Sequence, residues 1–131
     1  MLNPDARIAD LIRLGFSQAV IDLSSGRKPH PLFAFCCNDP HYIYHGGTTP
    51  FDLTIVPIWE DGTVLTAVLE NGGAVEIIQF SLEEPDEYWV VAHTEQGLWA
   101  YLFGGMLDGW AGVEQDVAMV NEAARPWSTS A

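Results

Sequence analysis

LTIVPIWEDGTVLTAVLENGGAVEIIQF, residues 53–80, is the stretch that decides the fold. It contains three runs of aliphatic and β-branched residues: Leu53–Trp59, Thr63–Leu69 and Val75–Phe80. Glu60-Asp61-Gly62 separates the first two runs, and Asn71-Gly72-Gly73 separates the last two. Glycine accepts the positive φ angles that tight hairpin turns require. The stretch therefore predicts three antiparallel strands joined as a meander.

Further strands are expected on both sides of this meander. Leu32–Cys37 is a compact apolar run typical of a buried strand, and Tyr42–Tyr44 predicts a shorter one. Tyr88–Ala92 is either a strand or a connector. Pro57 cannot donate a ladder hydrogen bond, so it predicts a sheet edge or a bulge within the first run.

Helices are predicted at both ends of the chain. Asn3-Pro4-Asp5 has the residue order of a helix start, and Gly15 can end that helix in a left-handed conformation. Phe16–Leu23 predicts a second short helix. Thr94 is a candidate N-cap for a late helix, and Glu114–Ala124 predicts a final one. The fold class is therefore α+β, an antiparallel meander sheet flanked by N-terminal and C-terminal helices, in a single domain over residues 1–131.

Charge is distributed unevenly along the chain. The formal net charge is -13, with 5 Lys and Arg against 18 Asp and Glu. No Lys or Arg occurs between Pro29 and Ala124, whereas fifteen Asp and Glu occur there. Such a surface repels nucleic-acid phosphate and anionic lipid, and attracts a basic protein. We therefore expect a protein partner, with neither nucleic acid nor membrane among the partners.

The residues with catalytic or metal-binding chemistry are few. Cys36, Cys37, His41 and His45 are conceivable as a metal cluster, but their spacing matches no strong zinc signature. A cysteine nucleophile needs nearby cations or a base to stabilise its thiolate, and this region is rich in carboxylates instead. The sequence predicts no catalytic residue, no metal site and no cofactor.

The N-terminus and the apolar runs bear on location. Residues 1–5, MLNPD, have no basic region followed by a long apolar segment, as a secretory signal would. The longest apolar runs are far too short to span a bilayer. We expect a soluble, cytoplasmic protein.

The order of elements resembles that of the SUKH superfamily of bacterial immunity-type domains. The resemblance covers residues 32–108 and is carried by VPIWEDG (56–62), VEIIQFSLE (75–83) and TEQGL (94–98). The chain departs from the family after the first helices, where a Leu-Pro pair, a tyrosine and an Asn-Gly turn are usual. The resemblance implies a domain that binds and neutralises a bacterial toxin, often a nuclease or a secretion-system effector, and has no catalytic residues.

The resulting prediction is an immunity protein that contacts a basic toxin directly, in the context of bacterial competition. Its partner-binding residues are predicted to be Glu60, Asp61, Glu83, Glu84, Asp86, Glu87 and Trp89. Among the large aromatic residues Trp59, Tyr88, Trp89, Trp99 and Trp110, one or two are expected to be exposed. Two alternatives stay open: a regulatory or scaffold domain of the same fold, and a small enzyme that uses the cysteines and histidines above for a metal or ligand.

Overall fold

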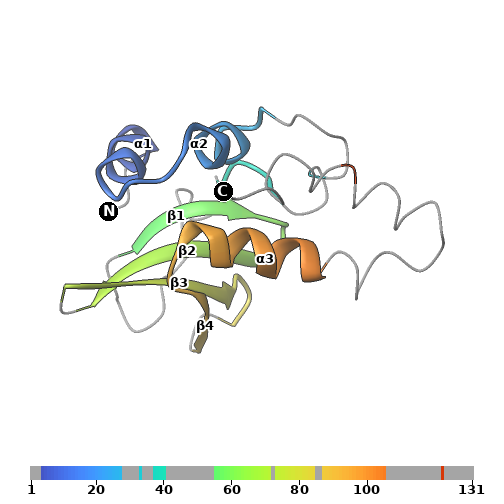
Figure 1. Cartoon of the computed structure of the whole chain (residues 1–131). Helices are drawn as coiled ribbons and strands as arrows, with labels where there is room; N and C mark the ends of the chain where they lie inside the picture. The colour runs from blue at the N-terminus through green and yellow to red at the C-terminus, as the bar shows by residue number, and fades with distance from the viewer. Residues whose placement is uncertain are drawn as a thin grey trace.

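The computed structural model describes residues 4–27, 33, 37–40, 55–71, 73–84, 87–105 and 122. Its elements are α1 (Pro4–Arg13), α2 (Gln18–Ser24), β1 (Ile55–Glu60), β2 (Val64–Asn71), β3 (Ala74–Ser81), β4 (Tyr88–Ala92) and α3 (Glu95–Gly105). The four strands form one antiparallel sheet in the order β1-β2-β3-β4. The predicted α+β class and the predicted meander are confirmed, and Tyr88–Ala92 is a strand and not a connector (Figure 1).

The two hairpin turns follow the sequence signals. Gly62 lies in the β1–β2 turn at φ 93°, and Gly73 lies in the β2–β3 turn at φ 85°. Residues with a Cβ rarely adopt this region, so glycine is required at both turns. The β2–β3 register is regular from Val64 opposite Ser81 to Asn71 opposite Ala74.

β1 is an edge strand, and it is irregular where Pro57 lies. Pro57 pairs with Ala67, the next partners are Trp59 and Thr66, and Ile58 is the extra residue of a bulge. Both predictions for Pro57 are therefore confirmed. The outer side of β1 is not bare, because Asn38 and Glu60 exchange backbone hydrogen bonds of 2.9 and 3.0 Å.

The segment before this bridge differs from the prediction. The Cys37 N–H donates to the Phe33 carbonyl at 2.8 Å, a helical type of turn, so the strand predicted over Leu32–Cys37 is wrong at its described positions. An apolar run of this length cannot be assigned to strand or turn by periodicity alone. The strand predicted at 42–44 lies outside the described residues, as does the helix predicted at 114–124 except for Glu122, which is helical.

The helices begin and end at the expected kinds of residue. α1 ends before Gly15, which adopts φ 89°, and the Phe16 N–H returns to the Leu11 carbonyl at 3.1 Å. Thr94 caps α3 by accepting a hydrogen bond of 3.1 Å from the Gly97 N–H, as predicted. None of the helices in the described ranges has the length and apolar character needed to cross a membrane.

All three helices pack on one face of the sheet (Figure 1). Trp59 of β1 and Trp99 of α3 meet there with ring centroids 5.8 Å apart, and Trp99 stacks on Phe103 at 6.0 Å. A second cluster occupies the opposite face and consists of Ile55, Leu65, Ala67, Leu69, Ile78, Phe80 and Leu82. The sheet is therefore apolar on both faces.

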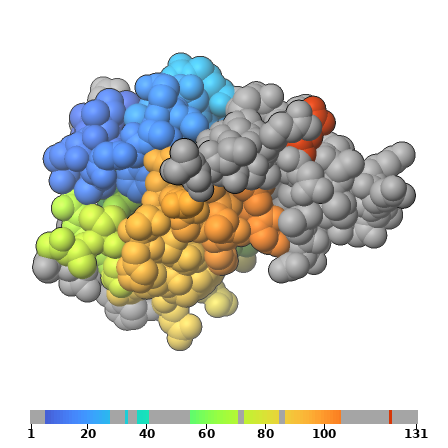
Figure 2. Space-filling model, viewed as in Figure 1, coloured from blue at the N-terminus to red at the C-terminus, as the bar shows by residue number. Residues whose placement is uncertain are grey.

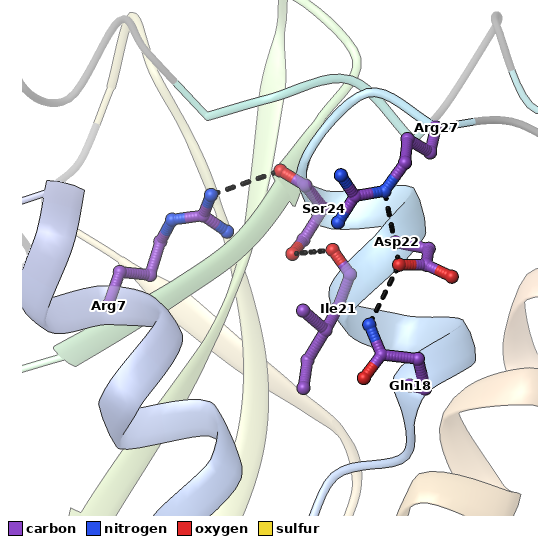
Figure 3. A network of polar contacts seen from close by, with 6 residues as sticks. All are labelled: Arg7, Gln18, Ile21, Asp22, Ser24 and Arg27. Carbon is purple, nitrogen blue, oxygen red and sulfur yellow. Dashed lines mark hydrogen bonds and ion pairs between the residues drawn. The ribbon is translucent and has the colours of Figure 1, made fainter.

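Arg7 connects three elements through one buried guanidinium. Its side chain is 5% exposed, and it donates to the Ser24 carbonyl at 3.1 Å (Figure 3). It also donates to the Ile58 carbonyl at 3.3 Å. Ser24 is the last residue of α2, so Arg7 places a cation at the negative end of that helix dipole. The carboxylate of Asp39 lies 3.8 Å away. Arg7 thus joins α1, α2 and the bulge of β1.

We expect Arg7→Met to lower the free energy of unfolding by about 2–4 kcal/mol, because two buried carbonyls lose their donor. Arg13→Met is the matched control, since Arg13 is half exposed and solvent screens its ion pairs. Chemical denaturation of both variants measures the difference. Equal losses in the two variants would contradict a special role for Arg7.

A surface ion pair makes stability depend on pH. Arg13 donates to Glu70 at 2.7 Å, and this hydrogen bond holds the pKa of Glu70 below its ordinary value of 4.5. Because the folded-state pKa is the lower one, Glu70 stabilises the fold fully above its unfolded pKa and loses that contribution as pH falls through the folded pKa.

The advantage of the wild type over Glu70→Gln in unfolding free energy is therefore expected at pH 7 and should disappear in strongly acidic buffer. Urea denaturation across this pH range measures it. An advantage that stays constant, or that grows as pH falls, would contradict the assignment.

Candidate functional site

Two turns that are distant in sequence lie side by side at one end of the sheet. The β1–β2 turn and the β3–β4 connection are both at this end, because β1 and β3 finish there while β2 and β4 start there. The Leu82 N–H donates to the Thr63 carbonyl at 2.8 Å and joins the two turns directly. We call the exposed carboxylates of these turns the acidic end, which comprises Asp61, Glu83, Glu84 and Glu87.

Side-chain acceptors shape both turns. Asp61 Oδ1 accepts hydrogen bonds from the Thr63 N–H at 2.8 Å and the Val64 N–H at 2.7 Å. Ser81 Oγ accepts from the Glu83 N–H at 3.2 Å and the Glu84 N–H at 3.3 Å. Asp61 therefore has a structural role in addition to its charge, whereas these bonds leave the carboxylates of Glu83 and Glu84 free to face a partner.

No cation neutralises the acidic end within the part of the chain that the structure describes. The three arginines in that part, Arg7, Arg13 and Arg27, all pair with carboxylates elsewhere. Those carboxylates belong to Asp10, Asp22, Asp39 and Glu70. Arg27 and Asp22, for example, pair at the C-terminal end of α2, 3.2 Å apart (Figure 3). The negative potential of the acidic end is thus unopposed by these arginines.

Trp89 lies on the edge strand β4, close in sequence to the acidic end. Trp89 is 43% exposed, whereas Trp59 and Trp99 are buried in the core. Tyr88 is half-buried, and Trp110 lies outside the described residues. Among the four of these five aromatic residues that the structure describes, Trp89 is the exposed one. One or two exposed residues were predicted for the set of five.

Of the predicted partner-binding residues, Glu60 is buried and Asp86 is not described. Glu60 is 7% exposed, because it pairs with Leu65 in the sheet and its backbone bonds to Asn38. Its placement on a docking face was therefore wrong: the hairpin signal located the turn one residue too early, and Glu60 is the last residue of β1. Asp86 lies outside the described residues. Asp61, Glu83, Glu84, Glu87 and Trp89 are exposed, as a binding role requires, and that role stays a prediction.

The cysteine and histidine candidates are not brought together by the described structure. Cys37 is a buried free cysteine, while Cys36, His41 and His45 lie outside the described residues. Among the residues that are described, no three His, Cys, Asp or Glu side chains are grouped as a metal site would require.

Sequence reasoning missed two residues beside Trp89. Gln79 of β3 accepts a hydrogen bond from Trp89 Nε1 at 3.2 Å and another from the Tyr101 hydroxyl at 3.1 Å. Tyr101 belongs to α3 and is 44% exposed. Gln79 is 10 and 22 positions from its two partners, and no pattern along the chain links residues at such separations.

Comparison with protein-family models, with curated proteins and with solved structures finds no match for this chain. The resemblance to the SUKH superfamily therefore rests on the sequence stretches at 56–62, 75–83 and 94–98 and stays a prediction.

The dual role of Asp61 can be separated by two substitutions. Asp61→Ala should lower the free energy of unfolding by about 1–2 kcal/mol, because two turn N–H groups lose their acceptor. Asp61→Asn keeps an acceptor oxygen and should cost less than half as much while removing the charge. Thermal or urea denaturation measures both, and identical costs would contradict the proposed turn role.

Proposed function

We propose that the chain is a cytoplasmic, non-enzymatic immunity-type protein that neutralises a basic bacterial toxin by direct contact through the acidic end and Trp89. The observation that carries this proposal is the convergence of Asp61, Glu83, Glu84 and Glu87 beside an exposed tryptophan, with the described arginines paired elsewhere. The resemblance of residues 32–108 to the SUKH superfamily supports the same class of function.

The physical roles of the two components differ. Unpaired carboxylates accelerate the encounter with a basic partner and fix its orientation, but exposed charges add little to the lifetime of a complex. A large aromatic side chain that becomes fully buried supplies much of the binding energy at an interface. The acidic end would therefore control the association rate, and Trp89 would control dissociation.

A toxin that cleaves or binds nucleic acid is the partner class that this surface fits best. Such a protein carries a basic cleft for phosphate, and a row of carboxylates can occupy that cleft in place of the phosphates. The same carboxylates repel nucleic acid itself. The chain would therefore block the toxin without binding the toxin's nucleic-acid substrate.

The test is coexpression with the effector encoded by the neighbouring gene, followed by growth measurement and copurification. The expected result is protection together with a stable complex. Absence of both would overturn the proposal.

The role of charge is tested by the triple variant Glu83→Gln, Glu84→Gln, Glu87→Gln. At low ionic strength its association rate constant should fall by about tenfold, and the difference should shrink as salt is added. Glu87→Gln is compared with Glu76→Gln as its matched control, because Glu76 lies on the same sheet near the opposite end of β3. Stopped-flow or surface-based kinetics would show equal effects of these two if the acidic end had no special role.

A further inference from the structure

Trp89 and Tyr101 are held together by one shared acceptor. They come from β4 and α3, which lie side by side (Figures 1 and 2). Both side chains donate to Gln79 Oε1. The Gln79 amide in turn donates to Thr66 Oγ1 at 3.0 Å, and Thr66 is 2% exposed. The two exposed rings, which we call the aromatic pair, are thus anchored to the buried part of the sheet.

The shared acceptor determines what the aromatic pair offers to a partner. The indole N–H and the phenol hydroxyl are both directed at Gln79, so the exposed 43% and 44% of these residues is largely carbon surface. The faces of aromatic rings carry partial negative charge and attract cations. Because the rings are already fixed, binding there costs less conformational entropy than binding to free side chains.

The charge around the aromatic pair selects the same kind of ligand. Glu87 directly precedes β4 and is two residues from Trp89, the spacing at which side chains share a face in extended backbone. Ser81, which positions the acidic turn, is two residues from Gln79 on β3. The aromatic pair therefore adjoins the acidic end on the helix-covered face of the sheet.

We propose that the aromatic pair is a preorganised docking site for an arginine side chain of the protein partner, with Glu87 supplying a carboxylate to the same guanidinium. This rests on the proposed function for the identity of the partner. Arginine fits better than lysine because its flat guanidinium can stack on a ring while its N–H groups, which lie in the guanidinium's own plane, stay available to a carboxylate. A second copy of this chain is a poorer occupant, since each copy has a net charge of -13.

The test uses three short acetylated and amidated peptides of the form Gly-X-Gly-X-Gly, where X is arginine, lysine or the neutral arginine analogue citrulline. Binding to the full chain is followed by NMR at the Trp89 indole N–H, whose resonance is identified by its loss in Trp89→Leu. The arginine peptide should bind about fourfold more tightly than the lysine peptide, and the citrulline peptide more weakly than both.

Variants distinguish binding at the aromatic pair from the general attraction of a basic peptide to the carboxylates. Trp89→Leu should abolish the preference for arginine over lysine, with binding measured by backbone amide shifts. Gln79→Leu should reduce the preference, and Gln79→Glu should retain it because an acceptor oxygen remains. Val90→Ala is the matched control: Val90 is 41% exposed on β4 but pairs with Ile78 on the other face.

An unchanged preference in Trp89→Leu, equal binding of the arginine and lysine peptides to the wild type, or equal binding of the citrulline peptide would each overturn this proposal. The two proposals fail separately. If the chain prefers arginine but does not protect against the effector encoded by the neighbouring gene, only the immunity proposal is contradicted. If it protects but shows no preference for arginine, only the arginine-site proposal is contradicted.

Discussion

The pairing of β2 with β3 is the constraint on which the rest of the structure depends. It is regular over the whole length of both strands, and it places Val64 opposite Ser81 and Thr66 opposite Gln79. The first alignment brings the acidic turns together, and the second supports the acceptor of the aromatic pair. A slip of one residue would move every side chain to the opposite face, so both features would be lost together. Such a slip would be costly because it would disrupt the close packing of both apolar clusters, one on each face of these strands.

Positive and negative charges have different tasks in this molecule. Arg7 is buried and holds α1, α2 and β1 together, while Arg13 and Arg27 are occupied by internal ion pairs. Some carboxylates are structural too: Glu95 accepts from the Ser17 N–H and hydroxyl and from Trp99 Nε1, and so links α3 to the start of α2. Within the acidic end, Asp61 also accepts two turn N–H groups, whereas the carboxylates of Glu83, Glu84 and Glu87 make no such contact in the described ranges, and for that reason we assign this end to binding.

The two edges of the sheet contrast in the same way. β1 is buried along its whole length, carries a proline and a bulge, and is bridged by Asn38. These are devices that protect an edge from further pairing. β4 has the sequence YWVVA, with two of its five side chains exposed, and this contrast agrees with placing the binding surface on the β4 side.

The sequence by itself determined the meander, its glycine turns, the bulge at Pro57 and the caps at Gly15 and Thr94, because each depends on the conformational preferences of adjacent residues. It also identified the excess of acid and named Trp89 among the candidate partner-binding residues. It failed at Leu32–Cys37, where an apolar run has no period, and at Glu60, where one position separates a strand residue from a turn residue. Only the tertiary structure decided that the two turns adjoin, that the described arginines are engaged elsewhere, and that Gln79 holds Trp89 and Tyr101. These are contacts between residues far apart along the chain, and they exist only when strand register and helix packing have placed the side chains.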